Sequence, residues 1–334
     1  MPKPFEKIVV IGSNSFSGSH FVKHCLTQGL QVLGMSRSEE PIIPFLPYRW
    51  KEKTPSGFSF EQLDLNRDTD RIITAIRKYE PDYVVNFAAQ GMVAESWLHP
   101  EHWYQTNVMG NVKLHDQLRH CSFLKKYVHV STPEVYGTCQ GNVLERAPFN
   151  PSTPYAASRA ACELHLNTFF KNYHFPVVFT RAANVYGPGQ QLYRIIPRTI
   201  LSILLGKKIP LHGGGHSVRA FIHIDDVATG TLAVTRKGTP GEGYHLSTDR
   251  FISIRELVNM ICDRMQVPFE KVVEIVNDRP GKDAAYLLDS TKSQREFNWH
   301  PNILLEQGID EVIAWAQKHL PALKDQPLEY RHKE

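Results

Sequence analysis

The sequence has few cysteines, no long hydrophobic run and no large excess of charge of one sign. Its five cysteines are odd in number and form no CxxC pair, which predicts a reduced, cytoplasmic protein without a disulfide framework. No hydrophobic run is long enough to span a membrane, and a strand pattern begins at Lys7, so we expect neither a membrane span nor a signal peptide. The net charge is only +4 and the lysines and arginines are scattered, which argues against nucleic acid as a partner.

The usual motifs of metal sites are also missing. The sequence contains 16 histidines but no HExxH motif and no run of closely spaced cysteines and histidines, so we predict no metal ion. We interpret the pairs His99/His102 and His212/His216 as surface or loop residues. The three glycines at 213–215 lack the Lys-Ser/Thr of a phosphate loop, and a turn is the better interpretation.

What the sequence does have is a regular alternation of strand and helix patterns over its first half. Short runs rich in β-branched residues predict strands, and apolar residues spaced three or four positions apart predict helices. The predicted strands cover residues 7–11, 31–35, 82–87, 126–131 and 176–181, and the predicted helices cover 18–28, 70–78, 103–119 and 156–173. This order is typical of an α/β fold with a doubly wound parallel sheet of Rossmann type.

Beyond about residue 185 the pattern becomes irregular, because turns rich in glycine and proline crowd together. Two helices are expected there, over residues 253–265 and 304–319. We predict a first domain over residues 1–182, to which segments near 217–248 return, and a smaller α/β lobe made mainly of residues 183–330. Open α/β sheets bind ligands at the carboxyl ends of their strands, so the smaller lobe is expected to cover that edge and bind the substrate.

A glycine-containing turn follows the first strand and opens the first helix. The segment Gly12-Ser-Asn-Ser-Phe-Ser-Gly18 places small residues where backbone N–H groups approach the pyrophosphate of a dinucleotide. A serine stands where a third glycine is common, so the match is partial, and a tight turn without a ligand is the alternative. The turn predicts cofactor-binding roles for Gly12, Ser15, Phe16, Ser17 and Gly18.

The tip of the second strand bears on the choice between NAD and NADP. NAD-specific sites place an acidic residue there to bind the ribose hydroxyls, whereas an arginine accommodates the 2′-phosphate of NADP. The sequence has Arg37 and no acid at this tip, which favours NADP, although a solvated turn residue is an alternative role for Arg37. Asp64 and Leu65 follow the next strand pattern and are predicted to meet the adenine.

Two further motifs predict a group of catalytic side chains. Residues 131–137 are Ser-Thr-Pro-Glu-Val-Tyr-Gly at the end of a strand, and Tyr155 and Arg159 lie four positions apart, on the same face of a helix. A phenol beside a fixed cation has a lowered pKa, which suits a proton acceptor in the oxidation of an alcohol. Thr132 is predicted to hold the substrate hydroxyl, and Glu134 to place a carboxylate in the same pocket. The alternative makes Tyr155 a packing residue and Glu134 a surface acid.

These motifs resemble those of the extended short-chain dehydrogenase/reductases, and among them most closely the nucleoside-diphosphate-hexose 4,6-dehydratases of the dTDP-glucose type. The resemblance covers nearly the whole chain. Its further segments are Phe87-Ala-Ala-Gln90, Thr106-Asn107-Val108, Arg181-Ala-Ala-Asn184-Val-Tyr-Gly-Pro188, Ile196-Pro197, Val218-Arg219 and Asp278-Arg279-Pro280-Gly281. The last three are the more specific, because they are characteristic of nucleotide-sugar enzymes.

The resemblance implies a mechanism. Tyr155 takes the proton of the C4 hydroxyl while hydride passes from C4 to the nicotinamide, and Glu134 removes the C5 proton, which the C4 ketone makes acidic. Water then leaves from C6 and the hydride returns to C6, so the cofactor, NAD or NADP, is regenerated in each cycle and stays tightly bound. The simple 4-epimerases usually have a small residue in place of Glu134, which favours a dehydratase.

The resemblance also implies where a nucleoside-diphosphate sugar and the cofactor bind. Its expected substrate-binding residues are Gln90, Thr132, Pro133, Asn184, Arg194, His212, Arg219 and Arg279. Among them Asn184 and Arg219 match positions that contact the diphosphate, and His212 matches a position at the base. The residues expected to border the cofactor, besides those of the first turn, are Ala88, Ala89, Asn107, Tyr155 and Arg159. Helices 103–119 and 156–173 are expected to pair across a two-fold axis in a homodimer.

Two residues depart from the dehydratase pattern and leave other functions open. Pro133 replaces the aspartate that protonates the departing C6 hydroxyl, so elimination needs another acid or a water molecule. Arg159 replaces the usual lysine, and it keeps the positive charge but is bulkier and planar. An epimerase acting at C3 or C5, or a ring-contracting synthase, starts from the same C4 oxidation and need not expel the C6 hydroxyl. A non-catalytic dinucleotide-binding protein is a third interpretation, which Tyr155 and Glu134 oppose.

Overall fold

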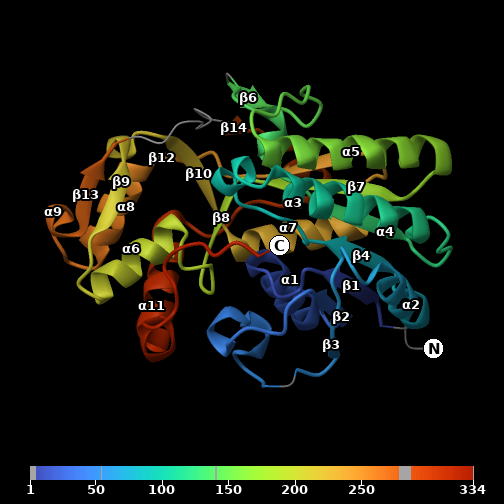
Figure 1. Ribbon diagram of the computed structural model, residues 1–334, viewed down its shortest axis with the longest axis horizontal. Helices are drawn as coiled ribbons and strands as arrows, with labels where there is room; N and C mark the ends of the chain where they lie inside the picture. Colours follow the sequence, from blue (N-terminus) through green and yellow to red (C-terminus); the bar gives the residue numbers. More distant parts are fainter. Residues whose placement is uncertain (1–4, 54, 140, 278–286, 334) are drawn as a thin grey trace.

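The computed structural model describes residues 5–53, 55–139, 141–277 and 287–333 of the chain. Seven parallel strands form its central sheet, in the order β11-β7-β5-β4-β1-β2-β3 (Figure 1). The bounds of these strands are Lys7–Ile11 for β1, Gln31–Ser36 for β2, Phe58–Gln62 for β3, Tyr83–Asn86 for β4, Lys126–Val130 for β5, Val177–Ala182 for β7 and Gly243–Leu246 for β11. Because the strand order reverses between β1 and β4, the sheet is doubly wound, and the predicted α/β Rossmann fold is confirmed.

Helices cover both faces of this sheet. Successive side chains of β1 point to opposite faces, so Ile8 and Val10 belong to one apolar cluster and Val9 and Ile11 to another. The first cluster takes in residues of α1 (Phe16–Thr27) and α7 (Ile224–Lys237), and the second takes in residues of α2 (Thr69–Tyr79), α4 (Asn111–Leu118) and α5 (Pro154–Tyr173). These four of the five residues of β1 are at most 2% exposed, which is the burial expected of a parallel sheet covered on both sides.

The rest of the chain builds smaller sheets and helices beside the carboxyl ends of the strands (Figure 1). Three small sheets pair β12-β10-β8, β13-β9 and β14-β6. Their strands are β6 (Asn142–Val143), β8 (Asn184–Tyr186), β9 (Ile209–His212), β10 (Val218–His223), β12 (Phe251–Ser253), β13 (Val273–Val276) and β14 (Leu287–Leu288). The remaining α-helices of the described residues are α3 (Pro100–Tyr104), α6 (Ile195–Leu204), α8 (Ile254–Arg264), α9 (Phe269–Val272), α10 (Thr291–Phe297) and α11 (Leu305–Leu323). A division of the chain at residue 182 stays a prediction.

The sequence analysis left α6 and α7 unpredicted, although it found the two helices near residues 253–265 and 304–319. α6 has Pro197 in its first turn, and α7 contains Gly230 and several β-branched residues, which have low helix propensity. Packing compensates in α7, because a Cβ on Gly230 would lie 2.6 Å from Leu246 Cδ2 and 2.9 Å from Trp299 Nε1. The glycine therefore lets α7 approach these side chains more closely than a larger residue would. Among the described residues, no helix combines the length and apolar character that crossing a bilayer requires.

Candidate active site

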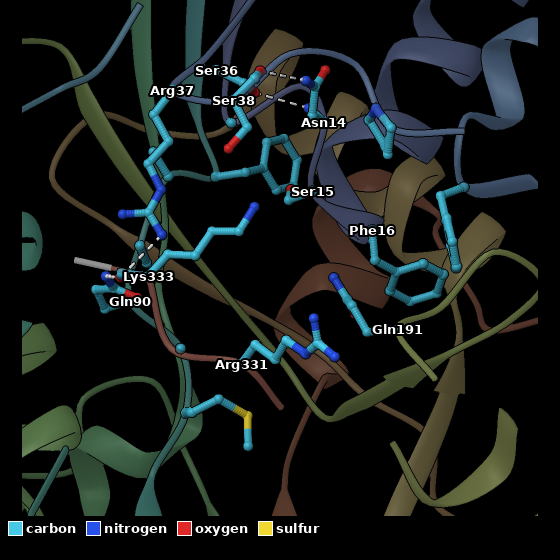
Figure 2. A pocket seen from close by; sticks show the side chains of 18 of the residues that line it. Asn14, Ser15, Phe16, Ser36, Arg37, Ser38, Gln90, Gln191, Arg331 and Lys333 are labelled. Carbon is cyan, nitrogen blue, oxygen red and sulfur yellow. Dashed lines mark hydrogen bonds between the residues drawn. The ribbon is translucent and has the colours of Figure 1, made fainter. Parts of the chain in front are cut away.

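A cavity of about 660 Å³ lies at the carboxyl ends of β1, β2, β3 and β4 (Figure 2). This volume is in the range of small-molecule and cofactor sites. The predicted cofactor-binding residues that line it are Gly12, Ser15, Phe16, Arg37, Asp64, Leu65, Ala88 and Ala89. Gln90 and Arg194, which were predicted for the substrate, line it as well. The structure therefore gathers most of the predicted cofactor-binding residues around one space.

The turn between β1 and α1 requires its two glycines. Gly12 has a φ of +82°, and a Cβ there would lie 2.7 Å from the backbone N of Ala88, while a Cβ on Gly18 would collide with the Gly12 carbonyl oxygen. Ser15 caps α1, because its hydroxyl accepts a hydrogen bond from the N–H of Gly18 at 3.0 Å. Ser17 and Gly18 lie in the first turn of α1 behind the cavity wall. The N-terminus of α1 thus faces the cavity, as a pyrophosphate site requires.

The tip of β2 is tied both to this turn and to the end of the chain. Ser36 Oγ accepts a hydrogen bond from Asn14 N at 3.0 Å, and Asn14 Nδ2 donates to the Ser38 carbonyl at 3.0 Å. Arg37 lines the cavity, and its Nη2 donates to the carbonyl oxygen of Lys333 at 3.3 Å. Arg37 is thus engaged by a segment that lies almost 300 residues further along the chain.

Asn107 holds the loop that follows β4. It lies in a π-helical turn, Gln105–Gly110, which interrupts the helix predicted over residues 103–119. The Asn107 Oδ1 accepts from Gln90 N at 2.9 Å, and its Nδ2 donates to the Gln90 carbonyl at 3.1 Å and to Ser158 Oγ at 2.9 Å. Both ends of the buried amide are therefore used to fix the loop Ala88–Gln90 against α5, and a direct contact of Asn107 with the cofactor stays a prediction.

Thr132, Glu134 and Tyr155 come together beyond the end of β5. The Thr132 hydroxyl accepts a hydrogen bond from Glu134 N at 3.3 Å and caps a short 3-10 helix, Pro133–Tyr136. Pro133 takes the first position of that helix, where its fixed φ fits and its missing N–H costs nothing. Tyr155 lies in the first turn of α5, where its phenol hydrogen-bonds with Thr132 and is close enough to Glu134 to interact electrostatically.

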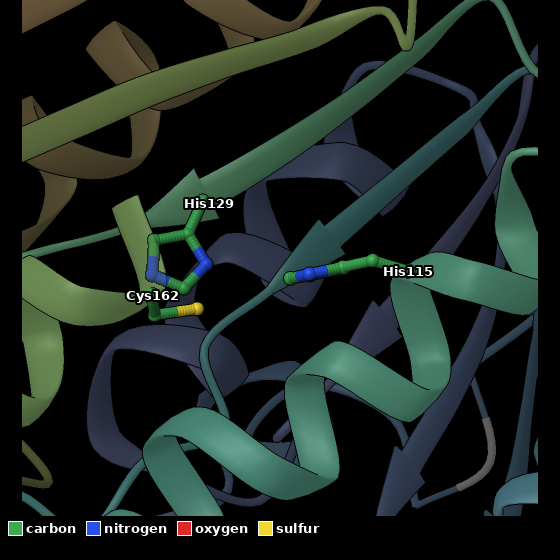
Figure 3. Close-up of side chains that lie close together, drawn as sticks. All are labelled: His115, His129 and Cys162. Atoms are coloured by element: carbon green, nitrogen blue, oxygen red, sulfur yellow. The ribbon is translucent and has the colours of Figure 1, made fainter. Parts of the chain in front are cut away.

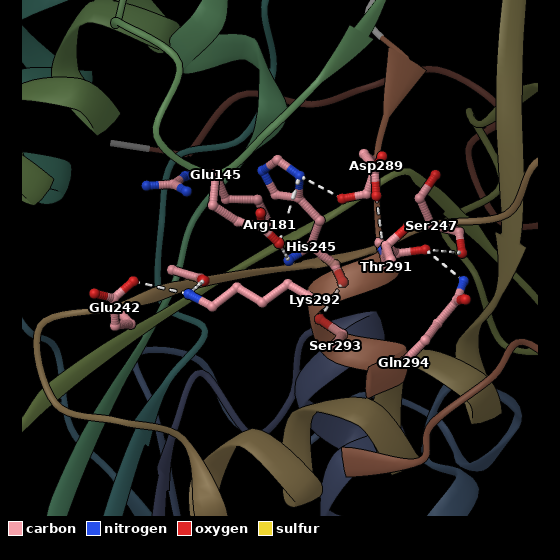
Figure 4. A network of polar contacts seen from close by, with 12 residues as sticks. Glu145, Arg181, Glu242, His245, Ser247, Asp289, Thr291, Lys292, Ser293 and Gln294 are labelled. Atoms are coloured by element: carbon pink, nitrogen blue, oxygen red, sulfur yellow. Dashed lines mark hydrogen bonds and ion pairs between the residues drawn. The ribbon is translucent and has the colours of Figure 1, made fainter. Parts of the chain in front are cut away.

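A buried polar network supports the 3-10 helix from the side of the sheet, and Figure 4 shows its members Arg181, His245 and Asp289. Tyr136 Oη accepts from Arg181 Nη1 at 2.8 Å and pairs with His245 Nε2, also at 2.8 Å. Arg181 forms a buried ion pair with Glu163 of α5, and His245 Nδ1 pairs with the Asp289 carbonyl at 3.0 Å. The network ties β7, β11 and α5 to the helix that carries the Glu134 carboxylate, which fixes its backbone relative to Tyr155.

Arg159 is a buried cation at the end of β5. Only 2% of its surface is exposed, and its Nη2 donates to the Val130 carbonyl and to His129 Nε2, the latter at 3.2 Å. Burial together with the positive charge of Arg159 keeps the pKa of His129 far below its usual range, so the imidazole is neutral and can accept this bond. Arg159 Nε and Nη1 are buried without a hydrogen-bond partner among the described residues. The close glycine turn at Gly12 fits the pyrophosphate of a nicotinamide dinucleotide, and the two donors without a partner are suited to hydroxyl acceptors. Neither Arg159 nor Tyr155 is among the residues that line the cavity, so a contact of Arg159 with the ribose stays a prediction.

His129 also belongs to a group that the sequence did not predict, with His115 and Cys162 (Figure 3). The three come from α4, β5 and α5, and their potential ligand atoms lie within 4.8 Å of one another. His115 Nε2 pairs with Tyr127 Oη at 2.8 Å, and burial raises the pKa of the Cys162 thiol to about 12. Within this group His129 is the member shown to hydrogen-bond Arg159, and we assign no metal to the group.

The pKa expected for Tyr155 is wrong in direction. Burial of the phenol raises its pKa above the usual value, and the Glu134 carboxylate raises it further, while Arg159, Thr132 and Arg194 lower it. Burial wins, because taking a phenolate out of water costs more than these neighbours return. Arg159 therefore acts to limit a raised pKa and does not bring it below that of an exposed tyrosine.

Three of the residues predicted to bind the diphosphate and the base lie in the smaller sheets. Asn184 is in β8 and its Nδ2 donates to the Ala220 carbonyl at 3.3 Å, while Arg219 is in β10 and His212 ends β9. Arg194 occupies the N-cap position of α6 without a side-chain capping hydrogen bond, and it lines the cavity. Arg279 lies outside the described residues. Substrate-binding roles for these five residues stay predictions.

Comparisons with known proteins agree with this geometry. The sequence matches the family described as GDP-mannose 4,6 dehydratase over residues 9–312. The chain belongs to this family. The dTDP-D-glucose 4,6-dehydratase of Homo sapiens is 35% identical to it over 326 residues, which cover 96% of this chain and 92% of the human protein. The resemblance predicted from the motifs is thereby confirmed.

Solved structures extend the family likeness to the whole fold. The crystal structure of DesIV, a dTDP-glucose 4,6-dehydratase from Streptomyces venezuelae with NAD bound, superposes with a TM-score of 0.87 at 29% identity. It covers 97% of this chain and 100% of its own. The UDP-glucose 4-epimerase of Thermotoga maritima superposes with a TM-score of 0.85 at 25% identity, over 94% of this chain and 99% of its own. Dehydratases and epimerases of the family thus share this architecture.

The sequence analysis missed two parts of the site. His129 was placed in a strand, and nothing in the pattern Lys126–Ser131 indicated that its ring would meet Arg159, 30 residues later. The segment 326–333, which lines the cavity, was also not assigned to the site. An Arg in place of the family's lysine is the one signal that pointed to an altered environment at this position.

Replacing Arg159 with methionine should move the ascending limb of the pH–rate profile of this family member to higher pH. Tyr155 must be deprotonated to accept a proton, and Arg159 lowers the pKa of Tyr155, so loss of the cation raises that pKa. We expect the ascending limb of the kcat/KM profile to move up by about one pH unit. Arg159→Lys is the matched control and should shift the limb much less. An unchanged limb in Arg159→Met would contradict the electrostatic role of Arg159.

Proposed function

We propose that this chain is a nucleoside-diphosphate-hexose 4,6-dehydratase that uses bound NAD. The observation that carries the proposal is the grouping of Thr132, Glu134 and Tyr155 beside the buried donors of Arg159 at the end of β5. A phenol that accepts a proton from an alcohol and a carboxylate in the same pocket are what oxidation followed by elimination needs. The relatives named above and the NAD in their solved structures support the assignment.

In this proposal the residues of the chain handle the protons. Tyr155 accepts the proton of the C4 hydroxyl, which Thr132 positions by a hydrogen bond. Bound NAD supplies the hydride acceptor for C4 and the donor for C6. Glu134 then removes the C5 proton, which the neighbouring ketone has acidified. Asn184, Arg194, Arg219 and Arg279 bind the diphosphate, and His212 lies against the base.

Pro133 favours the alternative functions that do not expel the C6 hydroxyl. It is buried and has no proton to donate, so residue 133 cannot protonate the departing C6 hydroxyl. The proton for that step comes from another acid or from water. Without such a donor the reaction stops at the ketone, and an epimerase or a ring-contracting synthase becomes the function of the same pocket.

Mass spectrometry of the products separates these functions. The purified chain is incubated overnight with dTDP-glucose, UDP-glucose, CDP-glucose and GDP-mannose, one substrate at a time. We expect one of these sugars to lose one water molecule. An isomer of unchanged mass would instead assign epimerisation, and no turnover of any sugar with NAD retained would assign a non-catalytic dinucleotide-binding protein.

Glu134→Gln should abolish both dehydration and the incorporation of solvent deuterium at C5. The amide has nearly the same shape as the carboxylate but cannot accept the C5 proton, so a loss of at least 100-fold in kcat is expected. Glu101→Gln changes an exposed acid and is the matched control, which should retain both activities. Deuterium at C5 in Glu134→Gln at the wild-type rate would refute the role of Glu134.

We further propose a homodimer that pairs α4 and α5 across a two-fold axis. Leu164 of α5 is a large apolar side chain with 56% of its surface exposed. A neighbouring subunit packed against this helix would cover it. Sedimentation equilibrium should give a dimer for the wild-type chain and a monomer for Leu164→Glu, and a monomeric wild type would refute the pairing.

A further inference from the structure

The chain beyond α11 runs back toward the middle of the molecule (Figure 1), and residues of this segment line the cofactor cavity. We call residues 326–333 the strap. Six of its eight residues line the cavity: Gln326, Pro327, Glu329, Tyr330, Arg331 and Lys333. The strap lies beyond the stretch that matches the family, which ends at residue 312, so the family match assigns it no role.

Aromatic contacts anchor the strap next to the cavity. The His332 ring stacks on the buried ring of Trp103, with centroids 5.1 Å apart and planes at 8°. His332 Nε2 also pairs with His102 Nδ1 at 2.8 Å. Tyr330 packs edge-on against Tyr193, with centroids 5.3 Å apart. His102, which the sequence analysis interpreted as a surface or loop residue, therefore helps to hold the strap in place.

The strap also bridges the two sides of the cavity through its backbone. The Lys333 carbonyl oxygen accepts from Gln90 Nε2 at 2.6 Å and from Arg37 Nη2 at 3.3 Å. Gln90 follows β4 and Arg37 ends β2, so one carbonyl joins the loops on either side of the β1 turn. A ligand under the strap could not leave past Lys333 without breaking these bonds.

The strap brings positive charge to the cavity. Figure 2 shows the Arg331 and Lys333 side chains extending from the strap into the space that the turn and the tip of β2 surround. Arg37 and Arg194 line the same space, and the first turn of α1 contains no acidic residue. Three carboxylates, Glu39, Asp64 and Glu329, also line the cavity, so its lining carries one more cation than anions. The two phosphates of a dinucleotide would add negative charge that the cations Arg331 and Lys333 can bind.

We propose that the strap closes over the bound dinucleotide and that Arg331 and Lys333 bind its phosphate groups. The inference rests on the proposed function only in taking a nicotinamide dinucleotide as the ligand. The cavity keeps a volume of about 660 Å³ with the strap in place, so the strap forms a wall of the site and does not fill it. It accounts for a cofactor that stays bound through each catalytic cycle.

The rate at which NADH dissociates tests directly whether the strap retains the dinucleotide. NADH fluorescence reports binding without any sugar. Each variant is loaded with NADH and chased with excess NAD in a stopped-flow instrument. A chain that ends at Asp325 should release NADH at least tenfold faster than the full chain, and His332→Ala, which loses the anchor, should release it about three- to tenfold faster. Thermal melting without ligand checks that each variant is folded.

A charge variant keeps the test valid if truncation disturbs the fold. Arg331→Gln combined with Lys333→Gln retains the anchors and should weaken NADH binding about tenfold at low salt, with a smaller difference at 0.5 M NaCl because salt screens the attraction. The matched control is Lys324→Gln, an exposed cation on the approach to the strap, which should bind like the wild type.

Two results would overturn the proposal. Release and affinity within twofold of the wild type in all strap variants would show that the strap does not hold the dinucleotide. Tighter binding after truncation would show that the strap competes with the dinucleotide and inhibits the enzyme. If the full chain binds no NADH at all, the proposed function fails as well, whereas sugar turnover has no bearing on the strap.

Discussion

The buried guanidinium of Arg159 is the group on which the candidate site depends. Removing a cation from water costs several kcal/mol, and among the described residues no carboxylate pairs with it. The chain offers neutral acceptors, His129 Nε2 and the Val130 carbonyl, and leaves Nε and Nη1 unsatisfied. Each buried donor without a partner costs about 1–3 kcal/mol. Such a cost is typical of a site that a ligand completes, and ribose hydroxyls are acceptors of the right kind.

The rest of the site is arranged around that cation. Tyr155 lies one turn away on α5, in a place where burial alone would make it a very weak acid, and Arg159 offsets part of that effect. The ion pair of Arg181 with Glu163 fixes the same helix at a second point and holds the 3-10 helix that carries Glu134. Asn107 holds the loop after β4 against α5. The proton-transfer groups are therefore positioned by buried polar contacts that their own sequence motifs do not contain.

The sequence predicted what depends on local pattern and missed what depends on distant contacts. The turn at Gly12, five of the seven strands of the large sheet and the Tyr155/Arg159 spacing follow from short-range rules, and the structure contains each of them. α6 and α7 were missed because packing overrides their weak helix propensity, as at Gly230. The predicted direction of the pKa shift of Tyr155 was wrong, because the motif does not show that the phenol is buried. His129 and His332 act on residues 30 and more than 200 positions away, which no periodicity indicates.

The central claim is that the cavity at the ends of β1, β2 and β4 holds NAD as a resident cofactor. The most direct test is to purify the chain without added nucleotide, denature it and identify the released compounds by liquid chromatography and mass spectrometry. The account predicts close to one equivalent of NAD, in oxidised or reduced form, per chain. Release of NADP would contradict the choice of NAD and assign the role of Arg37 to a 2′-phosphate. Release of no dinucleotide, together with no binding of added NAD, would contradict the account of Arg159 and of the site built around it.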